Sequence, residues 1–116
     1  MPRFDKEALI LRFKQWAYTC LDVLKDLESN NESRVVSYQM AKSSTSSYQN
    51  YRAACRAKSK ADLINKLKIV EEETDETIGW LEIINDRTAI DCKLEIQEGE
   101  ELLSIIVSSI KTLKQK

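Results

Sequence analysis

The stretch LINKLKIVEEETDETIGWLEII, residues 63–84, carries the clearest heptad pattern in the chain. Apolar and small side chains recur in it at intervals of three and four residues, which places them on one face of a helix. The positions are Leu63, Leu67, Val70, Thr74, Thr77, Leu81 and Ile84. Ser59 followed by Asp62 resembles a capping box, with Asp in place of the longer Glu. We therefore expect a long amphipathic helix that opens at Ser59 and ends before NDRT at 85–88.

Three further stretches share this periodicity, so the sequence predicts four helices. The expected bounds are Phe4 to Glu28, Glu32 or Ser33 to Ala54, Ser59 to Ile84, and Asp91, as N-cap, to Leu113. The expected core-facing residues are Leu9, Phe13, Trp16, Cys20 and Leu24 in the first helix, Val36, Met40, Ser43, Ser47, Tyr51 and Ala54 in the second, and Ile96, Leu103, Ile106, Ile110 and Leu113 in the fourth. Gly99 falls within the fourth helix, where glycine costs about 1 kcal/mol relative to alanine. We expect it to mark close helix packing.

The composition favours a single all-α domain. Two glycines and one proline occur in 116 residues, whereas a β-sandwich or barrel of this size needs turn residues about every ten positions. A chain of this length is expected to form one domain, residues 1–116. No apolar run approaches the ~18 residues that span a bilayer, and acids interrupt the N-terminal stretch where a signal peptide is apolar. We expect a cytoplasmic protein with no membrane partner.

The lack of histidine removes most catalytic and metal chemistry from consideration. Histidine-based triads and zinc sites lack their essential residue, and neither of the common glycine-rich phosphate loops is present. Glu73 and Glu76 have the spacing of paired helix carboxylates, but a di-metal bundle site also uses histidine, so a solvated or interface role is favoured. We predict a protein that is not an enzyme, with no catalytic or metal-binding residues, no cofactor and no small-molecule substrate.

The cysteines and tryptophans are interpreted as packing residues. Cys20, Cys55 and Cys92 are odd in number and widely spaced, which indicates reduced thiols rather than a disulfide framework or a zinc knuckle. They lack a flanking cluster of the kind that lowers a thiol pKa, so the sequence gives no support for redox sensing. Trp16 and Trp80 are expected to be large core or interface anchors.

Apolar residues cover a wider arc of three helices than one bundle core requires. Beside the stripes above lie Ile10, Ala17 and Leu21 in the first helix, Ile64, Ile69, Ile78, Trp80 and Ile83 in the third, and Leu102, Ile105 and Val107 in the fourth. Since a helix in a bundle buries an arc of roughly 100°, the surplus predicts a second buried surface. We interpret it as the subunit interface of a homo-oligomer.

Charge is segregated along the chain, although the net charge is −1. Residues 1–58 contain ten bases and six acids, whereas residues 59–116 contain eight bases and thirteen acids. The segment EEETDE, residues 71–76, concentrates five acids, and SSTSSYQNYRAACRAKSK, residues 43–60, has four bases and no acid. We favour pairing of the acidic helix with this basic end, within a subunit or between subunits. The alternative is a phosphate-binding face for nucleic acid, which the overall acidic composition disfavours.

Seven residues are candidates for such a contact, whether with a neighbouring subunit or with nucleic acid. They are Lys42, Tyr48, Tyr51, Arg52, Arg56, Lys58 and Lys60. In the nucleic-acid alternative, the two tyrosines stack on bases. The hydroxyl residues at 43–47 are small enough for close helix packing, and their hydroxyls can bond the carbonyls of the preceding turn. We favour this role over nucleophilic chemistry because no base is available to activate a serine.

Residues 39–82, QMAKSSTSSYQNYRAACRAKSKADLINKLKIVEEETDETIGWLE, resemble the bacterial four-helix bundle proteins of the 23S rRNA-intervening sequence family. The matching positions are Lys42, Ser43, Thr45, Ser46, Asn50, Tyr51, Arg52, Ala54, Arg56, Ser59, Lys60, Asp62, Leu63, Ile64, Lys66, Leu67, Glu72, Asp75, Glu76, Trp80, Leu81 and Glu82. The tail SSIKTLK, residues 108–114, also fits the family. Tyr48 and Gln49 depart from it, because relatives often have small residues at these positions.

The resemblance implies a fold and an assembly rather than an activity. Members of the family are up-down-up-down four-helix bundles that associate as ring-shaped pentamers, and their molecular role is largely unassigned. A distant relative, the accessory protein of diversity-generating retroelements, is a basic pentamer that binds nucleic acid and a reverse transcriptase. We therefore expect a cyclic homo-oligomer, most simply a pentamer, acting as a non-enzymatic scaffold or interaction protein. The alternative is a nucleic-acid accessory protein that uses the basic end of the second helix.

Overall fold

The computed structural model describes residues 5–115, which form four α-helices and no strand. The helices are α1 (Lys6–Leu24), α2 (Asn31–Ala54), α3 (Lys60–Arg87) and α4 (Lys93–Lys114). The predicted all-α class and the predicted number of helices are confirmed for this part of the chain. The expected start of the first helix at Phe4 lies outside the described residues.

Side chains just outside three of the helices cap their first amides. Asp5, Asn30 and Ser59 each accept a hydrogen bond from a backbone N–H in the first turn of α1, α2 and α3. At Ser59 the donor is the amide of Asp62, at 3.1 Å, which confirms the predicted capping residue. The carboxylate of Asp62 accepts from the amide of Lys58 at 3.0 Å. These bonds satisfy amides that have no partner within the helix.

Three predicted helix ends were wrong by a few residues, and α3 continues through NDR to Arg87 instead of ending at Ile84. α1 stops at Leu24 rather than Glu28, because hydrogen bonds to the third preceding residue take over, such as Leu27 N to Leu24 O at 3.3 Å. This tighter turn lets Leu27 pack against the core. The N-cap of α4 is Cys92 rather than Asp91, although the Asp91 carboxylate still accepts from the amide of Lys93 at 3.0 Å. The Cys92 side chain is fully buried, and its amide donates to Oδ1 of Asn85 at 2.9 Å.

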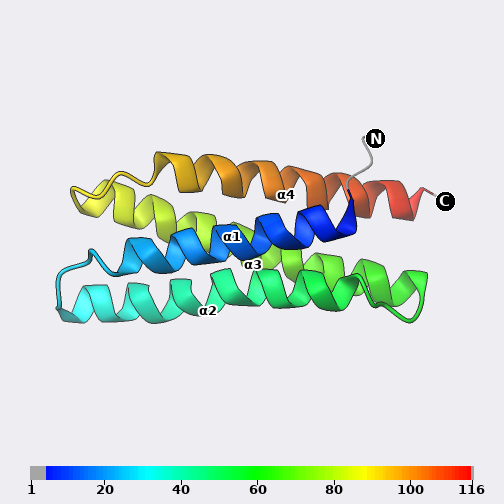
Figure 1. Cartoon of the computed structure of the whole chain (residues 1–116), viewed down its shortest axis with the longest axis horizontal. Helices are drawn as coiled ribbons and strands as arrows, with labels where there is room; N and C mark the ends of the chain where they lie inside the picture. The colour runs from blue at the N-terminus through cyan, green and yellow to red at the C-terminus, as the bar shows by residue number, and fades with distance from the viewer. Residues whose placement is uncertain (1–4, 116) are drawn as a thin grey trace.

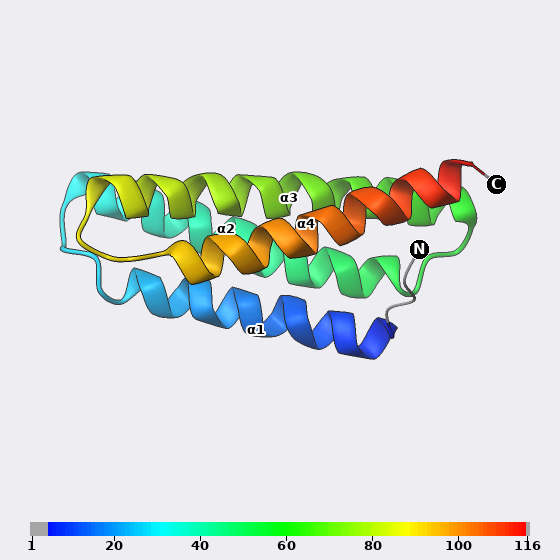
Figure 2. The ribbon, with the colours of Figure 1, turned by 90° about the horizontal axis from the view of Figure 1, so that it is seen from above.

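The four helices pack lengthwise around one core, and consecutive helices lie side by side (Figures 1 and 2). The chain enters and leaves at the same end of the molecule, where the α2–α3 connection also lies (Figure 1). Figure 2 shows that α1 and α4 diverge toward this end. The contact between α1 and α4 is correspondingly the least extensive of the four helix pairs.

The predicted apolar stripes form the core in α1, α2 and α3. In α4 the buried face is rotated about the helix axis relative to the predicted stripe. The six residues predicted for α2 are all buried, as are all those predicted for α1 and α3 except the half-buried Leu24 and Leu63. In α4 the buried residues are Gly99, Leu102, Ile105, Ile106 and Ile110, whereas Ile96, Leu103 and Leu113 are half-buried. The predicted core face of α4 was therefore wrong in part, because it was centred on Leu103 rather than on Leu102. The close approach of α1 at Gly99 turns the Leu102 side of the helix inward.

The surplus apolar residues divide into two groups. Ala17, Ile78, Leu102 and Ile105 are buried within the chain, so their assignment to a second surface was wrong. Each lies beside a predicted stripe that is wider than expected, because α1, α3 and α4 each contact two neighbouring helices. By contrast Ile69, Ile83 and Val107 are exposed, at 41%, 40% and 44%. The remaining surplus residues, Ile10, Leu21, Ile64 and Trp80, are half-buried.

Hydroxyl side chains pack the central part of α2 against α3. Ser43, Ser44 and Ser47 are fully buried, and each donates to a carbonyl three residues earlier, as predicted. Thr77 of α3 donates to the Ser43 hydroxyl across the two helices, with an Oγ1 to Oγ distance of 2.7 Å. Small side chains let the two helices approach closely, and local bonding removes the cost of burying their hydroxyls.

Gly99 allows the indole of Trp16 to lie directly against α4. A Cβ atom at Gly99 would lie 2.5 Å from Cζ2 of Trp16 and 2.9 Å from Cγ1 of Ile78. The indole Nε1 donates to the backbone carbonyl of Glu95, one turn earlier in α4, at 2.8 Å. Trp16 is 2% exposed. The expectation that Gly99 marks close helix packing is confirmed.

Replacement of the two glycines by alanine should have opposite effects on stability. Gly99→Ala should lower the free energy of unfolding by about 1–3 kcal/mol, because the new methyl group overlaps two buried side chains. Gly79→Ala, where nothing lies within 4 Å of the added Cβ, should raise it by about 0.5–1 kcal/mol through helix propensity. Urea denaturation followed by circular dichroism measures both changes. Stabilisation by Gly99→Ala would contradict the packing described for Trp16.

Candidate functional site

The basic residues at the end of α2 and the start of α3 face solvent. Arg52, Arg56, Lys58 and Lys60 are all exposed. Cζ of Arg52 lies 5.7 Å from the centroid of the Tyr48 ring, a cation–π arrangement that holds the guanidinium at the surface. These side chains and the half-buried Tyr48 form a basic surface at one end of the molecule, which we call the basic end.

Two of the seven candidate residues do not belong to the basic end. Lys42 is exposed in the middle of α2. Tyr51 is 8% exposed and stacks on Phe13 of α1, with ring centroids 5.1 Å apart and an interplanar angle of 25°. Burial, together with the adjacent Cys55 thiol, raises the pKa of the Tyr51 phenol. Contrary to the sequence-based expectation, its ring is not available to stack on a base.

The connection between α2 and α3 is held by local hydrogen bonds. Lys66 Nζ lies 2.6 Å from Oδ1 of Asp62, and the Lys58 amide donates to the other carboxylate oxygen. The hydrogen bond from Lys66, followed by that from the Lys58 amide, lowers the pKa of Asp62. These bonds hold the backbone at Lys58 against the first turn of α3, where Lys60 also lies.

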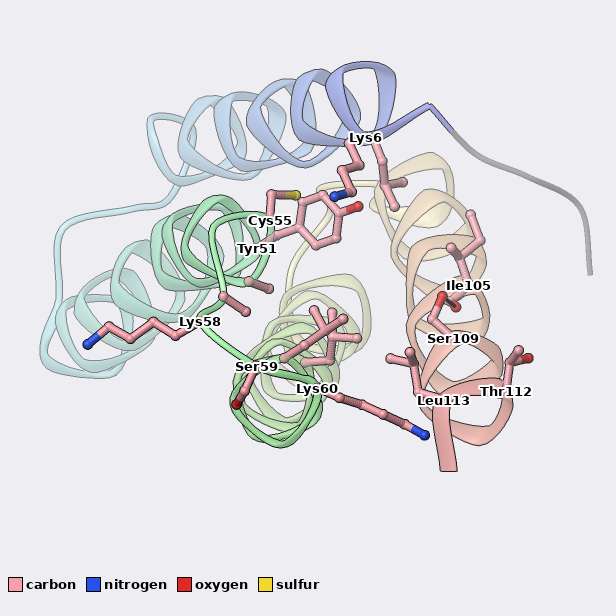
Figure 3. Close-up of a pocket in the computed structure, with 15 residues that line it drawn as sticks. Lys6, Tyr51, Cys55, Lys58, Ser59, Lys60, Ile105, Ser109, Thr112 and Leu113 are labelled. Atoms are coloured by element: carbon pink, nitrogen blue, oxygen red, sulfur yellow. Dashed lines mark hydrogen bonds between the residues drawn. The ribbon is translucent and has the colours of Figure 1, made fainter. Parts of the chain in front are cut away.

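A cavity of about 490 Å³ opens beside the basic end, where α1 and α4 diverge (Figure 3). Its apolar lining comes from all four helices and includes Leu9, Ala54, Leu63, Leu67, Ile105 and Leu113. Lys6, Lys58 and Lys60 also line it, together with the buried Tyr51 and the half-buried Cys55. Sequence reasoning identified Tyr51, Lys58 and Lys60 but missed the contributions of α1 and α4. No periodicity signals a cavity, because it depends on the separation between helices.

The acidic segment 71–76 lies apart from three bases of the basic end, Arg52, Arg56 and Lys58. Among residues 5–115, no ion pair joins its carboxylates to Arg52, Arg56 or Lys58. The hydrogen bond between Ser43 and Thr77 gives the reason. It aligns the acids with residues 44–49 of antiparallel α2, which carry no charge. Pairing within one subunit, one of the two arrangements expected from the sequence, is therefore not formed.

Ion pairs instead join α1 to α4 and the start of α2 to the end of α3. The Arg12 guanidinium contacts Glu98 at 2.7 Å and Glu101 at 3.2 Å, and the hydrogen bond to Glu98 raises the pKa of Arg12. Arg87 contacts Glu32 at 3.0 Å. The sequence does not single out these pairs, because they depend on the rotation of one helix relative to the next.

Comparison with known proteins finds a similar solved structure. No protein-family profile matches the sequence, and no curated protein does either. The chain is similar to a protein of unknown function from the S23 ribosomal protein family of Bacteroides thetaiotaomicron VPI-5482, whose crystal structure is known. The two sequences are 31% identical. The alignment covers 91% of this chain and 97% of that one, with a TM-score of 0.78. The chain belongs to the S23 ribosomal protein family.

This S23-family membership agrees with the sequence-based resemblance in fold class and in the lack of an assigned role. It does not test the relation to the retroelement accessory protein, which stays a prediction. Among residues 5–115 of the S23-family chain, no three cysteine or carboxylate side chains gather in a way that could hold a metal ion. None of the helices in that range is long and apolar enough to cross a membrane. The expected cytoplasmic location stays a prediction.

The cysteines of this S23-family protein differ in accessibility. Cys20 and Cys92 are fully buried and Cys55 is half-buried. Burial, followed by the nearby carboxylate of Glu95, raises the pKa of Cys20 to about 12 and that of Cys92 to about 11. Since the thiolate is the reactive form, two of the three thiols are both covered and protonated at neutral pH.

Alkylation of the folded protein should therefore occur at a single thiol. With iodoacetamide at pH 8, we expect Cys55 to react and Cys20 and Cys92 to react at least about 100-fold more slowly, because they are buried and protonated. Mass spectrometry of the intact protein and its peptides gives the rates. Cys55→Ser should abolish the fast reaction, and unfolding in urea should equalise the remaining two. Labelling of Cys20 at the rate of Cys55 would contradict the packing of the core.

Proposed function

We propose that this protein is a non-enzymatic scaffold, a single-domain up-down-up-down bundle that functions as a cyclic homo-oligomer. The observation that carries the proposal is the acidic segment 71–76, whose carboxylates form no ion pair with Arg52, Arg56 or Lys58 within residues 5–115. Two complementary surfaces that cannot meet within a chain can meet between chains. The number of subunits, five, comes from the family resemblance.

The outer face of α3 has the composition of a contact surface. Ile69, Glu72, Glu76, Trp80 and Ile83 recur at helical spacing on this face, with apolar side chains at both ends and carboxylates between them. The side chains of Ile69 and Ile83 are 41% and 40% exposed. Tryptophan and partly buried apolar groups are enriched where proteins associate. We call these five residues the acidic face of α3.

The electrostatics of this region support a partner that is positively charged. The pKa of Glu73 is raised by partial burial and then by the repulsion of Glu76, an effect that the attraction of Lys42 does not cancel. Carboxylates that lie close together repel one another, and nearby positive charges reduce this repulsion. Arg52 and Arg56 of a second chain are exposed side chains of the required sign.

A ring follows from the positions of the two surfaces. The basic end lies where α2 gives way to α3, whereas the acidic face lies along the middle of α3. A contact between two different surfaces is heterologous, and such contacts generate closed rings when the rotation allows. A two-fold dimer can also pair unlike surfaces, but only where both belong to one self-complementary patch around the axis.

Nucleic-acid binding is the second candidate function, and the Arg52–Tyr48 pair is the observation that favours it. A guanidinium over an aromatic ring can contact a phosphate while the ring stacks on a base. The burial of Tyr51 removes one of the two expected stacking rings. The overall net charge of −1 also opposes binding to a polyanion. We therefore rank this candidate below assembly.

Light scattering at low micromolar concentration should give a mass several times 13.4 kDa. The double variant Arg52→Glu/Arg56→Glu should raise the concentration needed for assembly by at least about tenfold, because charged pairs between subunits become repulsive. Adding Glu72→Arg and Glu76→Arg to that variant should restore assembly. Helicity should stay unchanged throughout, as circular dichroism would show.

A matched control is Lys25→Glu/Arg34→Glu, which makes the same change in net charge at exposed sites in the α1–α2 connection and early α2. It should leave the mass unaltered. A monomeric wild-type protein would contradict the assembly proposal, and a ring indifferent to the double reversal would contradict its electrostatic part. Salt-sensitive binding of labelled RNA, lost in the Arg52/Arg56 variant but not in the control, would favour the second candidate.

A further inference from the structure

A cavity lies between the diverging ends of α1 and α4, beside the basic end. We propose that it binds a single-chain amphiphile with an anionic head, such as a medium-chain carboxylate. The ligand's tail would lie between the four helix ends and its carboxylate beside Lys6 and the Tyr51 hydroxyl. This site does not depend on the proposed function.

The lining and size of the cavity fit an unbranched apolar tail. The side chains of Leu63, Leu67, Ile105 and Leu113 line it from α3 and α4, and Leu9 lines it from α1. Its volume of about 490 Å³ is within the usual range for small-molecule sites. A water molecule, similar in size to a methylene group, takes about 30 Å³, so a chain of about ten carbons and its head group fits.

The charged residues that line the cavity are all basic. Lys6, Lys58 and Lys60 line it, and among residues 5–115 no aspartate or glutamate does. Lys6 and Lys60 are the first residues of α1 and α3, where the helix dipole is positive and a cation is usually disfavoured. In Figure 3 the Lys6 side chain points toward Tyr51, whereas Lys60 extends outward past Leu113 and Lys58 points away from the cavity. An anionic head group would stabilise this concentration of positive charge.

Tyr51 adds a polar group within the apolar lining. Its side chain is almost fully buried yet borders the cavity, and in Figure 3 the Lys6 side chain extends toward it from α1. Because burial raises the pKa of the phenol, the hydroxyl stays protonated at neutral pH and can donate a hydrogen bond. A hydroxyl and an ammonium group on one side of the recess are suited to a carboxylate.

The shape of the recess favours a small ligand over a helix from a second copy. α1 and α4 approach again where Trp16 meets Gly99 and where Arg12 contacts Glu98 at 2.7 Å. The residues that line the cavity from α1 and α4, Leu9, Ile105 and Leu113 among them, lie on the side of this junction toward the start of α1 and the end of α4. A helix laid in a groove needs several turns of continuous apolar surface.

Calorimetric titration of decanoate into the full-length protein at pH 7 tests the proposal. One decanoate should bind per chain, at least about tenfold more tightly than decyltrimethylammonium, because the lysines repel a cationic head. Lys6→Gln should weaken decanoate binding about fivefold. Tyr51→Phe, which keeps the ring that stacks on Phe13, should also weaken it about fivefold. Lys58→Gln is the matched control, since this lysine points away from the cavity, and should have little effect.

Protection of Cys55 gives a second measurement that does not require altered residues. Cys55 lines the cavity, so saturating decanoate should slow its reaction with iodoacetamide at least about fivefold. Absence of decanoate binding would overturn the proposal. Equal binding of decanoate and decyltrimethylammonium, or equal losses in Lys6→Gln and Lys58→Gln, would also overturn it. If light scattering shows that decanoate binds only as the oligomer dissociates, the recess is covered by a second copy and the proposal is wrong.

Discussion

The contact between Trp16 and Gly99 fixes the relation of α1 to α4, which have the least extensive contact among the four pairs of neighbouring helices. An indole can lie this close to a helix backbone only where no Cβ intervenes, and its N–H reaches the carbonyl of Glu95 at 2.8 Å. One turn from Trp16, Arg12 contacts Glu98 and Glu101 and reinforces the same junction. The junction lies partway along α1, so the two helices can diverge beyond it toward the end that holds the termini (Figure 2).

On the opposite side of the bundle, buried hydroxyl side chains allow the helices to pack closely. α2 and α3 meet through a stripe of buried hydroxyl side chains, among them Ser43, Ser47 and Thr77. Because these hydroxyls bond the preceding turn or each other, the interface is close without leaving most of its polar groups unsatisfied. The result is an asymmetric bundle, tight between α2 and α3 and open between the ends of α1 and α4. This asymmetry produces the cavity and places it beside the basic end.

Antiparallel packing of α2 and α3 also determines the charge distribution on the surface. The alignment set by Ser43 and Thr77 places the acids of 71–76 beside the uncharged residues 44–49. The bases at 52–60 therefore collect at the end of the molecule, separate from those acids. Such a separation is unfavourable to an isolated chain but complementary between copies, as proposed for a homo-oligomer. Membership of the S23 ribosomal protein family adds a related fold, and the related protein itself has no known function.

The sequence by itself determined the number and type of helices, the buried stripes of α1, α2 and α3, the role of the buried serines and the close packing at Gly99. These features are local: periodicity, capping and side-chain size act within a few turns of one helix. Only the tertiary structure decided that Leu102 rather than Leu103 faces the core, that Tyr51 is buried against Phe13, and that a cavity opens between helix ends. These depend on the rotation of each helix about its axis and on the distance between axes, which are set by contacts between residues far apart in the chain.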